Sequence, residues 1–236
     1  PKHLLLDLDG TLLANRRWWV SLEFSVRALA RFRPYLSGWG EAIQTLKEAR
    51  EALTALHHPG STNEERLVRV LAARMRIPPQ SARQFFEEQI ASIFPLMRPH
   101  FFPVPGAKEF VEWASAHYSP ACLSLATNPL WPEGLALLRL KWADIDPSVF
   151  GLITHWGNMH ACKPRAEYYL EVCSMLGLKP EDCLLVGDDP KMDLPATQVG
   201  MQVYLVNGRE SGYRELRSAL AAGFEEGGGF STPASK

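Results

Sequence analysis

Three short apolar segments of the chain each run directly into acidic or hydroxyl side chains. The segments and the side chains that follow them are 2–8 with Asp7 and Asp9, 121–126 with Thr127 and Asn128, and 183–186 with Asp188 and Asp189. Apolar runs of this length are typical of strands that are buried on both faces of a sheet. In a parallel sheet, the carboxyl ends of the strands border the ligand crevice. We therefore expect polar side chains that are far apart in the sequence to converge on one cleft.

The second half of the chain alternates between helical and strand patterns. From Gly106 onward, the pattern predicts helices at 107–117, 133–142, 164–176 and 194–199, and strands at 121–126, 149–154, 183–186 and 203–206. Strands that alternate with helices favour an α/β fold whose parallel sheet is covered on both faces. We predict a doubly wound, Rossmann-like core formed by residues 1–13 and 101–224.

Residues 14–100 have a different pattern and contain helical periodicity without a convincing strand. Trp19, Leu22, Val26 and Leu29 recur at helical spacing and predict one buried face, with Trp18 also in the core. Two later helices, 61–75 and 81–93, each begin at a serine, which is a favourable N-cap residue. A proline-rich stretch then marks the return from an inserted helical domain. The Gly-rich segment 225–236 is predicted to be a flexible tail.

The composition excludes several classes of protein. Lys and Arg number 25 against 26 Asp and Glu, a formal net charge of −1, whereas nucleic-acid binding requires a basic excess. No apolar run approaches the roughly 20 residues of a membrane span, and the N-terminus lacks a signal-peptide pattern. The four cysteines form no CxxC pair and are expected to be reduced. We therefore expect a cytoplasmic protein with neither a nucleic acid nor a membrane as partner.

The acidic residues at the strand ends require a counter-charge. At least three carboxylates in one cleft repel each other strongly, and a carboxylate site with few other ligands suits Mg²⁺. A bound Mg²⁺ with open coordination positions can also hold a phosphate oxygen. The sequence thus predicts Mg²⁺ as the cofactor.

Four motifs of the chain resemble those of the haloacid dehalogenase superfamily, and they occur in the family's order. The motifs are DxDGT at residues 7–11, an apolar strand ending at Thr127 and Asn128, Lys163-Pro164, and GDxxxxD at residues 187–193. In this family a helical cap is inserted where residues 14–100 stand. The resemblance therefore implies a Rossmann-like α/β core with an all-helical cap domain.

The resemblance also implies a role for each motif residue. Asp7 would be the nucleophile that forms an aspartyl-phosphate, and Asp9 would be the general acid and base. Asp7, Asp188 and the main-chain carbonyl of Asp9 would hold Mg²⁺. Thr127 would bind the phosphoryl group, and Lys163 would neutralise its charge. Asn128, Asp189 and Asp193 would support the site, with the orientation of Lys163 or of a metal-bound water left open between Asp189 and Asp193.

The second acidic residue of the first motif favours phosphate esters over haloacids. Dehalogenase members of the family lack an equivalent of Asp9, because a carbon–halogen bond needs no proton on its leaving group. We predict hydrolysis of a small phosphomonoester, a phosphorylated metabolite, with Arg16 and Arg17 as candidate substrate-binding residues. A sugar-phosphate mutase that uses the same intermediate, or a non-catalytic binding protein on the same fold, are the alternatives.

Overall fold

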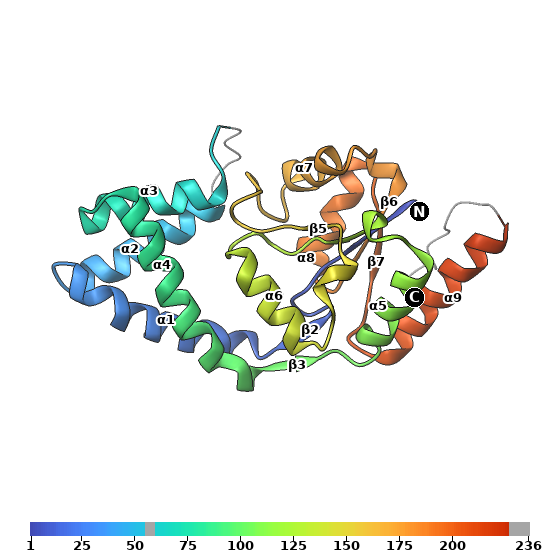
Figure 1. Ribbon diagram of the computed structural model, residues 1–236, viewed down its shortest axis with the longest axis horizontal. Helices are drawn as coiled ribbons and strands as arrows, with labels where there is room; N and C mark the ends of the chain where they lie inside the picture. Colours follow the sequence, from blue (N-terminus) through green and yellow to red (C-terminus); the bar gives the residue numbers. More distant parts are fainter. Residues whose placement is uncertain (55–59, 227–236) are drawn as a thin grey trace.

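The centre of the molecule is a five-stranded sheet whose neighbouring strands are all parallel (Figure 1). The computed structural model describes residues 1–54 and 60–226. The strands are β1 (His3–Leu6), β4 (Leu123–Leu125), β5 (Leu152–Ile153), β6 (Cys183–Gly187) and β7 (Gln202–Leu205), in the order β5-β4-β1-β6-β7. Because β1 lies between β4 and β6, the three segments that end in polar residues are direct neighbours. The predicted parallel α/β sheet is confirmed.

Successive strand residues point to opposite sides of the sheet, so both of its faces are apolar, and helices cover each of them. Leu4 and Leu6 belong to one buried cluster, together with residues of α5 (Ala107–His117), α6 (Glu133–Trp142) and α9 (Glu210–Glu226). Leu5 belongs to a second cluster, with residues of α7 (Ala166–Leu176) and the 3₁₀ helix Leu194–Val199. The helix predicted at 194–199 is this 3₁₀ helix, and it directly follows α8, the short helix Pro190–Asp193.

A helical insertion, residues 17–100, lies to the left of the sheet in Figure 1. It consists of α1 (Arg17–Phe32), α2 (Trp39–Thr54), α3 (Asn63–Met75), α4 (Pro79–Ile93) and a final 3₁₀ segment, Phe94–His100. Two short antiparallel strands, β2 (Leu13–Asn15) and β3 (Phe101–Pro103), carry the chain out and back. Three-residue strands are too short to show alternation in the sequence, which is why no strand was predicted here.

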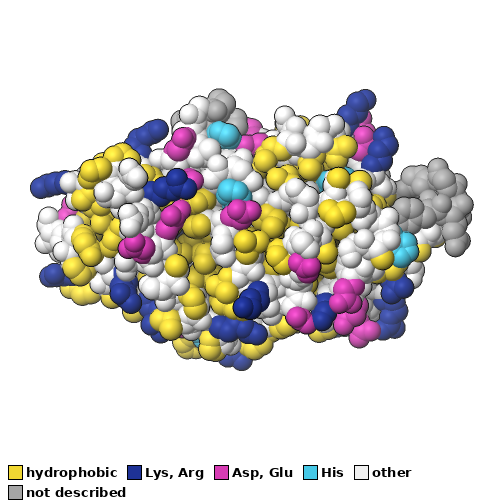
Figure 2. All heavy atoms as spheres, viewed as in Figure 1, with side chains coloured by type: hydrophobic (Ala, Val, Ile, Leu, Met, Phe, Trp, Pro, Cys, Tyr) yellow, Lys and Arg dark blue, Asp and Glu magenta, His cyan; other side chains and the backbone are white. Residues whose placement is uncertain are grey.

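The prediction for the buried face of α1 was wrong. Trp18 is 72% exposed and Trp19 is 54% exposed, and Leu22 and Val26 are exposed as well, whereas Ala28 and Phe32 on the opposite side are buried. Both sides of α1 carry apolar residues at helical spacing, so the periodicity alone does not select between them. Figure 2 shows hydrophobic side chains at the surface over the insertion.

The helix starts in the insertion also differ from the prediction. Thr62, rather than Ser61, is the N-cap of α3, where it forms a capping box with Glu65. The N-cap position of α4 is Pro78 and its first residue is Pro79, with no side-chain cap. Ser81 therefore lies inside that helix. Proline suits a first helical turn because its missing N–H would have no partner there.

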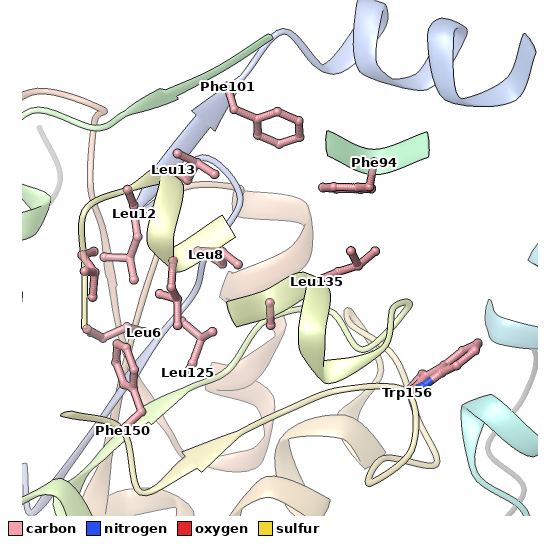
Figure 3. Close-up of a cluster of buried hydrophobic side chains, with 14 of the residues drawn as sticks. Leu6, Leu8, Leu12, Leu13, Phe94, Phe101, Leu125, Leu135, Phe150 and Trp156 are labelled. Atoms are coloured by element: carbon pink, nitrogen blue, oxygen red, sulfur yellow. The ribbon is translucent and has the colours of Figure 1, made fainter. Parts of the chain in front are cut away.

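One continuous apolar cluster joins the sheet to the insertion. Figure 3 shows it extending from Leu6 and Leu125 of the sheet to Phe94 and Phe101 at the return from the insertion. The ring of Phe94 stacks on Trp142 of α6, with 5.7 Å between centroids. The insertion therefore packs directly on the sheet-bearing part of the molecule.

The insertion also contacts the core at the start of α3. The side chain of Asn63 donates a hydrogen bond to the carbonyl of Pro129 (3.0 Å), and its backbone N–H donates to Met159 (2.9 Å). Arg66, which is buried, donates to the carbonyl of His160 (3.0 Å). These partners lie in two core loops, one of which leads directly to Lys163.

The predicted tail overlaps the last described helix of the chain by two residues. Residues 225 and 226 still belong to α9, which ends at Glu226, and 227–236 lie outside the described residues. Across residues 1–54 and 60–226, no helix is both long enough and apolar enough to cross a bilayer.

Candidate active site

Asp7 and Lys163 form the centre of the site. Asp7 follows β1 directly and is buried, and its Oδ1 accepts a hydrogen bond from Nζ of Lys163 at 2.8 Å. The same ammonium donates to Oδ1 of Asp193, also at 2.8 Å. Lys163 precedes α7, and the Lys163–Pro164 peptide bond is cis. Residues 156 positions apart in the sequence thus form a buried ion pair.

A third carboxylate joins Asp7 and Asp193 at the same strand ends. Asp188 follows β6, and oxygen atoms of Asp7, Asp188 and Asp193 all lie within 4.8 Å of one another. The Thr11 hydroxyl lies between two of them, 3.3 Å from Oδ2 of Asp7 and 3.2 Å from Oδ1 of Asp188. One hydroxyl proton can serve only one of these oxygens at a time.

The charges of this group suit a divalent cation. When all three carboxylates are ionised, the single ammonium of Lys163 leaves two negative charges uncompensated. Carboxylate oxygens at this density are ligands that Mg²⁺ prefers. Gly10 keeps the space beside them open: its φ is +97°, and an added Cβ would collide with the carboxylate of Asp188. The residues present therefore fit a bound Mg²⁺.

Burial and mutual attraction shift the pKa values of the group. It raises the pKa of Asp7 to about 7, against the opposing attraction of Lys163. Burial likewise raises the pKa of Asp188, although the Thr11 hydrogen bond opposes this. For Lys163, burial disfavours the ammonium, but attraction to the carboxylates, Asp7 first, outweighs it and raises the pKa. Without a cation, ionisation of all the carboxyl groups in this buried cluster thus costs free energy.

Thr127 lies buried after β4, and its side-chain oxygen has no hydrogen-bond partner among the described residues. Its carbonyl accepts hydrogen bonds from Thr154 (2.6 Å) and Tyr168 (3.0 Å). The neighbouring Asn128 accepts the backbone N–H of Lys163 on its Oδ1 at 3.2 Å. A buried hydroxyl without a partner costs free energy, so its position favours a ligand that supplies one.

Asp9 extends from the loop after β1 and does not belong to the three-carboxylate group. Its Oδ2 forms an ion pair with Nη1 of Arg139, a buried residue of α6. Arg139 is a contact that the sequence analysis missed, because nothing in the pattern of α6 distinguishes this arginine from a surface one. Thr11 was part of the first motif but was given no role.

The predicted supporting and substrate-binding residues differ in what they contact. Asp193, and not Asp189, contacts Lys163. Asp189 is the N-cap of α8 and forms an ion pair with Arg17, 3.3 Å between Nη2 and Oδ2. Arg16 lies over the ring of Phe102 instead, 5.2 Å from its centroid. Of the two arginines, the structure connects Arg17 to the strand ends and places Arg16 against β3.

Fold and site together define an α/β enzyme whose reactive groups are assembled at the carboxyl edge of a parallel sheet. A family model described as haloacid dehalogenase-like hydrolase matches residues 1–199. The chain belongs to this family of hydrolases. Among curated proteins, no match was found.

Solved structures with different activities share this fold. A 2-haloacid dehalogenase from Pseudomonas syringae pv. Tomato DC3000 is 18% identical, with a TM-score of 0.56, over 87% of this chain and 86% of that one. A phosphatase of the family from Thermococcus onnurineus is 20% identical, with a TM-score of 0.53, over 88% and 86%. A family hydrolase from Xanthomonas campestris is 16% identical, with a TM-score of 0.52, over 96% and 94%. At these identities the likeness shows the fold alone.

Proposed function

We propose that this protein hydrolyses a small phosphomonoester in a Mg²⁺-dependent reaction. The observation that carries the proposal is the excess of negative charge around Asp7, where three clustered carboxylates face one ammonium. Phosphoryl transfer relies mainly on positioning and on neutralisation of charge, and a divalent cation serves both. Hydrolysis of a haloacid needs no such cation, so the acidic excess favours phosphate chemistry.

In the proposed reaction, Asp7 is the nucleophile. An oxygen of its carboxylate forms a bond to phosphorus as the bond to the leaving oxygen breaks, which gives an aspartyl-phosphate. Lys163, 2.8 Å from Asp7, stabilises the negative charge of the transferring group. The unpartnered hydroxyl of Thr127 donates a hydrogen bond to the same group. Asp193 keeps the Lys163 ammonium in place.

In this proposal, Asp9 is the general acid of the first step and the general base of the second. It donates one to the leaving oxygen in the first step, and it accepts one from the water that attacks the aspartyl-phosphate in the second. Its side chain is 37% exposed, which suits a group that must reach substrate and water. Asp9 thus supplies the proton that an alkoxide leaving group needs and a halide leaving group does not.

Mg²⁺ would be held by Asp7, Asp188 and the main-chain carbonyl of Asp9, with Asp193 as a neighbouring carboxylate. When bound, it supplies positive charge that binds and polarises a phosphate oxygen. Thr11, whose hydroxyl lies within reach of both, would donate to one of the two carboxylates, Asp7 or Asp188, at a time.

The helical insertion acts as a cap in this proposal. It contacts the strand ends through Arg17, which reaches Asp189 beside the acidic group. A cap over the site excludes water and restricts the size of the substrate. This arrangement favours a phosphorylated metabolite over a phosphoprotein, with Arg17 as the residue closest to a role in substrate binding.

The test is phosphate release from a panel of small phosphomonoesters, with Mg²⁺ and with chelator, beside chloride release from 2-chloropropionate. Asp7→Asn is the reaction-blocking variant, and Asp182→Asn, a carboxylate paired with Lys2 away from the site, is the matched control. We expect phosphate release that needs both Mg²⁺ and Asp7. Chloride release without Mg²⁺ would contradict the proposal, as would a near-normal rate in Asp7→Asn. Transfer of phosphate to a sugar hydroxyl would favour a mutase instead.

A further inference from the structure

Arg139 is an unusual residue for its position. Only 3% of its side chain is exposed, although it carries a permanent charge on a helix of the core. Its Nε donates to the carbonyl of Leu135 at 3.1 Å, and its Nη1 pairs with Oδ2 of Asp9. Among residues 1–54 and 60–226, Asp9 is the only carboxylate that pairs with it. Burial of an unpaired charge costs free energy, so this ion pair restrains both the guanidinium and the carboxylate of Asp9.

The guanidinium also lies over an aromatic ring. Its central carbon lies 5.9 Å from the centroid of the Phe94 ring, at the return from the insertion. Phe94 in turn packs on Trp131 and Trp142. The cation–π contact, the ion pair and the hydrogen bond to the backbone together restrict the planar group. Arg139 therefore gives the carboxylate of Asp9 a partner with little freedom to move.

The ion pair uses only one of the two carboxylate oxygens of Asp9. Oδ2 faces Arg139 inside the molecule, whereas Oδ1 has no hydrogen-bond partner in the described part of the chain. The outer torsion of an aspartate side chain is broad when nothing restrains it. An anchor on Oδ2 restrains this torsion and leaves Oδ1 as the oxygen available to a ligand.

We propose that Arg139 is a positioning residue, which holds the carboxyl group of Asp9 so that Oδ1 faces the leaving oxygen of the substrate. This inference rests on the proposed phosphatase function. In the first step, the reacting form of Asp9 carries its proton on Oδ1 while Oδ2 accepts from Arg139. This proton passes to the leaving oxygen as the P–O bond breaks and the Asp7–phosphorus bond forms, which leaves Asp9 as the carboxylate. Proton transfer requires the two oxygens within hydrogen-bond reach, and misplacement by an ångström costs about 100-fold in rate.

The kinetic test compares two leaving groups in Arg139→Met and Arg139→Lys. A nitrophenolate leaves with little help from an acid, whereas an alkoxide needs a proton. We expect Arg139→Met to lower kcat for an alkyl phosphate about 10- to 100-fold more than for 4-nitrophenyl phosphate, with little change in KM. Arg139→Lys, which keeps the charge without the planar fork, should lie between Arg139→Met and the wild type.

Lys141→Met provides the matched control, because Lys141 is an exposed cation on the same helix. It should leave both rates unchanged. Equal losses on the two esters in the Arg139 variants would overturn the proposal, since a purely structural role does not depend on the leaving group. If Arg139→Met does not fold, the leaving-group dependence of Arg139→Lys decides.

A crystallographic comparison tests the anchor without turnover. We expect one orientation of the Asp9 carboxylate in the wild type and more than one in Arg139→Met. The same single orientation in both proteins would overturn the proposal. If the wild type cleaves no member of the phosphomonoester panel, the phosphatase function fails, and this comparison still decides whether Arg139 positions Asp9.

Discussion

The ammonium of Lys163 lies 2.8 Å from a carboxylate oxygen of Asp193, and both residues are almost fully buried. The other oxygen of Asp193 accepts the backbone N–H of Asp189 at 3.1 Å. Asp193 therefore connects the ammonium that faces Asp7 to the loop that carries the acidic residues after β6.

Asp193→Asn should damage both the stability and the activity. The amide keeps the shape but removes the charge that balances Lys163 and cannot accept on both of its atoms. We expect the free energy of unfolding to fall by about 1–3 kcal/mol and kcat to fall at least about tenfold. Urea unfolding and phosphate release measure the two effects. An unchanged kcat would show that Asp7 alone suffices to place Lys163.

Mg²⁺ should stabilise the folded protein, because its ligands converge only there. At a Mg²⁺ concentration of 100 times Kd, linkage adds about 2.7 kcal/mol to the free energy of unfolding. The rise in Tm should be lost with chelator and much reduced in Asp188→Asn, but kept in Asp182→Asn, whose carboxylate pairs with Lys2 away from the site. An equal rise in Asp188→Asn would contradict the assigned site.

His3 should make the protein sensitive to acid. Burial lowers its pKa from 6.5 to about 4, and its Nε2 lies 2.8 Å from the Ser124 hydroxyl. The unfolded chain therefore takes up the proton first as the pH falls. The stabilisation is fully present above pH 6.5 and is lost as the pH falls toward about 4, by at most about 3 kcal/mol.

Urea unfolding between pH 7.5 and 4 measures this loss in wild type and in His3→Gln. The variant should be less stable at neutral pH, but its stability should depend less on pH in this interval. Parallel curves for the two proteins would assign the acid sensitivity to other groups.

Arg66→Met should weaken the contact between α3 and the core. Arg66 donates to the carbonyls of Ala52, Ser61 and His160 at 2.8–3.0 Å, and these acceptors would lose their partner. We expect a loss of about 3 kcal/mol in the free energy of unfolding. Arg69→Met, an exposed arginine on the same helix, is the control and should change it by less than about 0.5 kcal/mol. Equal effects of the two variants would rule out the special role of Arg66.

Those parts of the fold that depend on local pattern could be predicted from the sequence. The buried strands end just before Asp7, Thr127 and Asp188, and these places could be predicted because apolar runs and their polar ends are both local features. Parallel pairing then places these ends together, as β1 between β4 and β6 shows.

Other features depend on tertiary contacts that leave no local signal. Arg139 is distinguished only by the loop and the phenylalanine that enclose it. The buried side of α1 is selected by Phe24 packing on Trp131, 5.0 Å between centroids, and not by the periodicity of the helix. The roles of Asp189 and Asp193 could be separated only by geometry, since both follow the same strand.

The double attachment of the insertion has a mechanical consequence. A domain held by β2 and β3 alone could rotate about that pair as about a single axis. The hydrogen bonds of Asn63 and Arg66 add a second fixed point, on loops that lead to Lys163. Large rotation of the insertion therefore requires that these bonds break first. If the protein is the phosphatase proposed above, opening at the start of α3 would then have to precede substrate entry and product release, and would limit turnover separately from the reaction at Asp7.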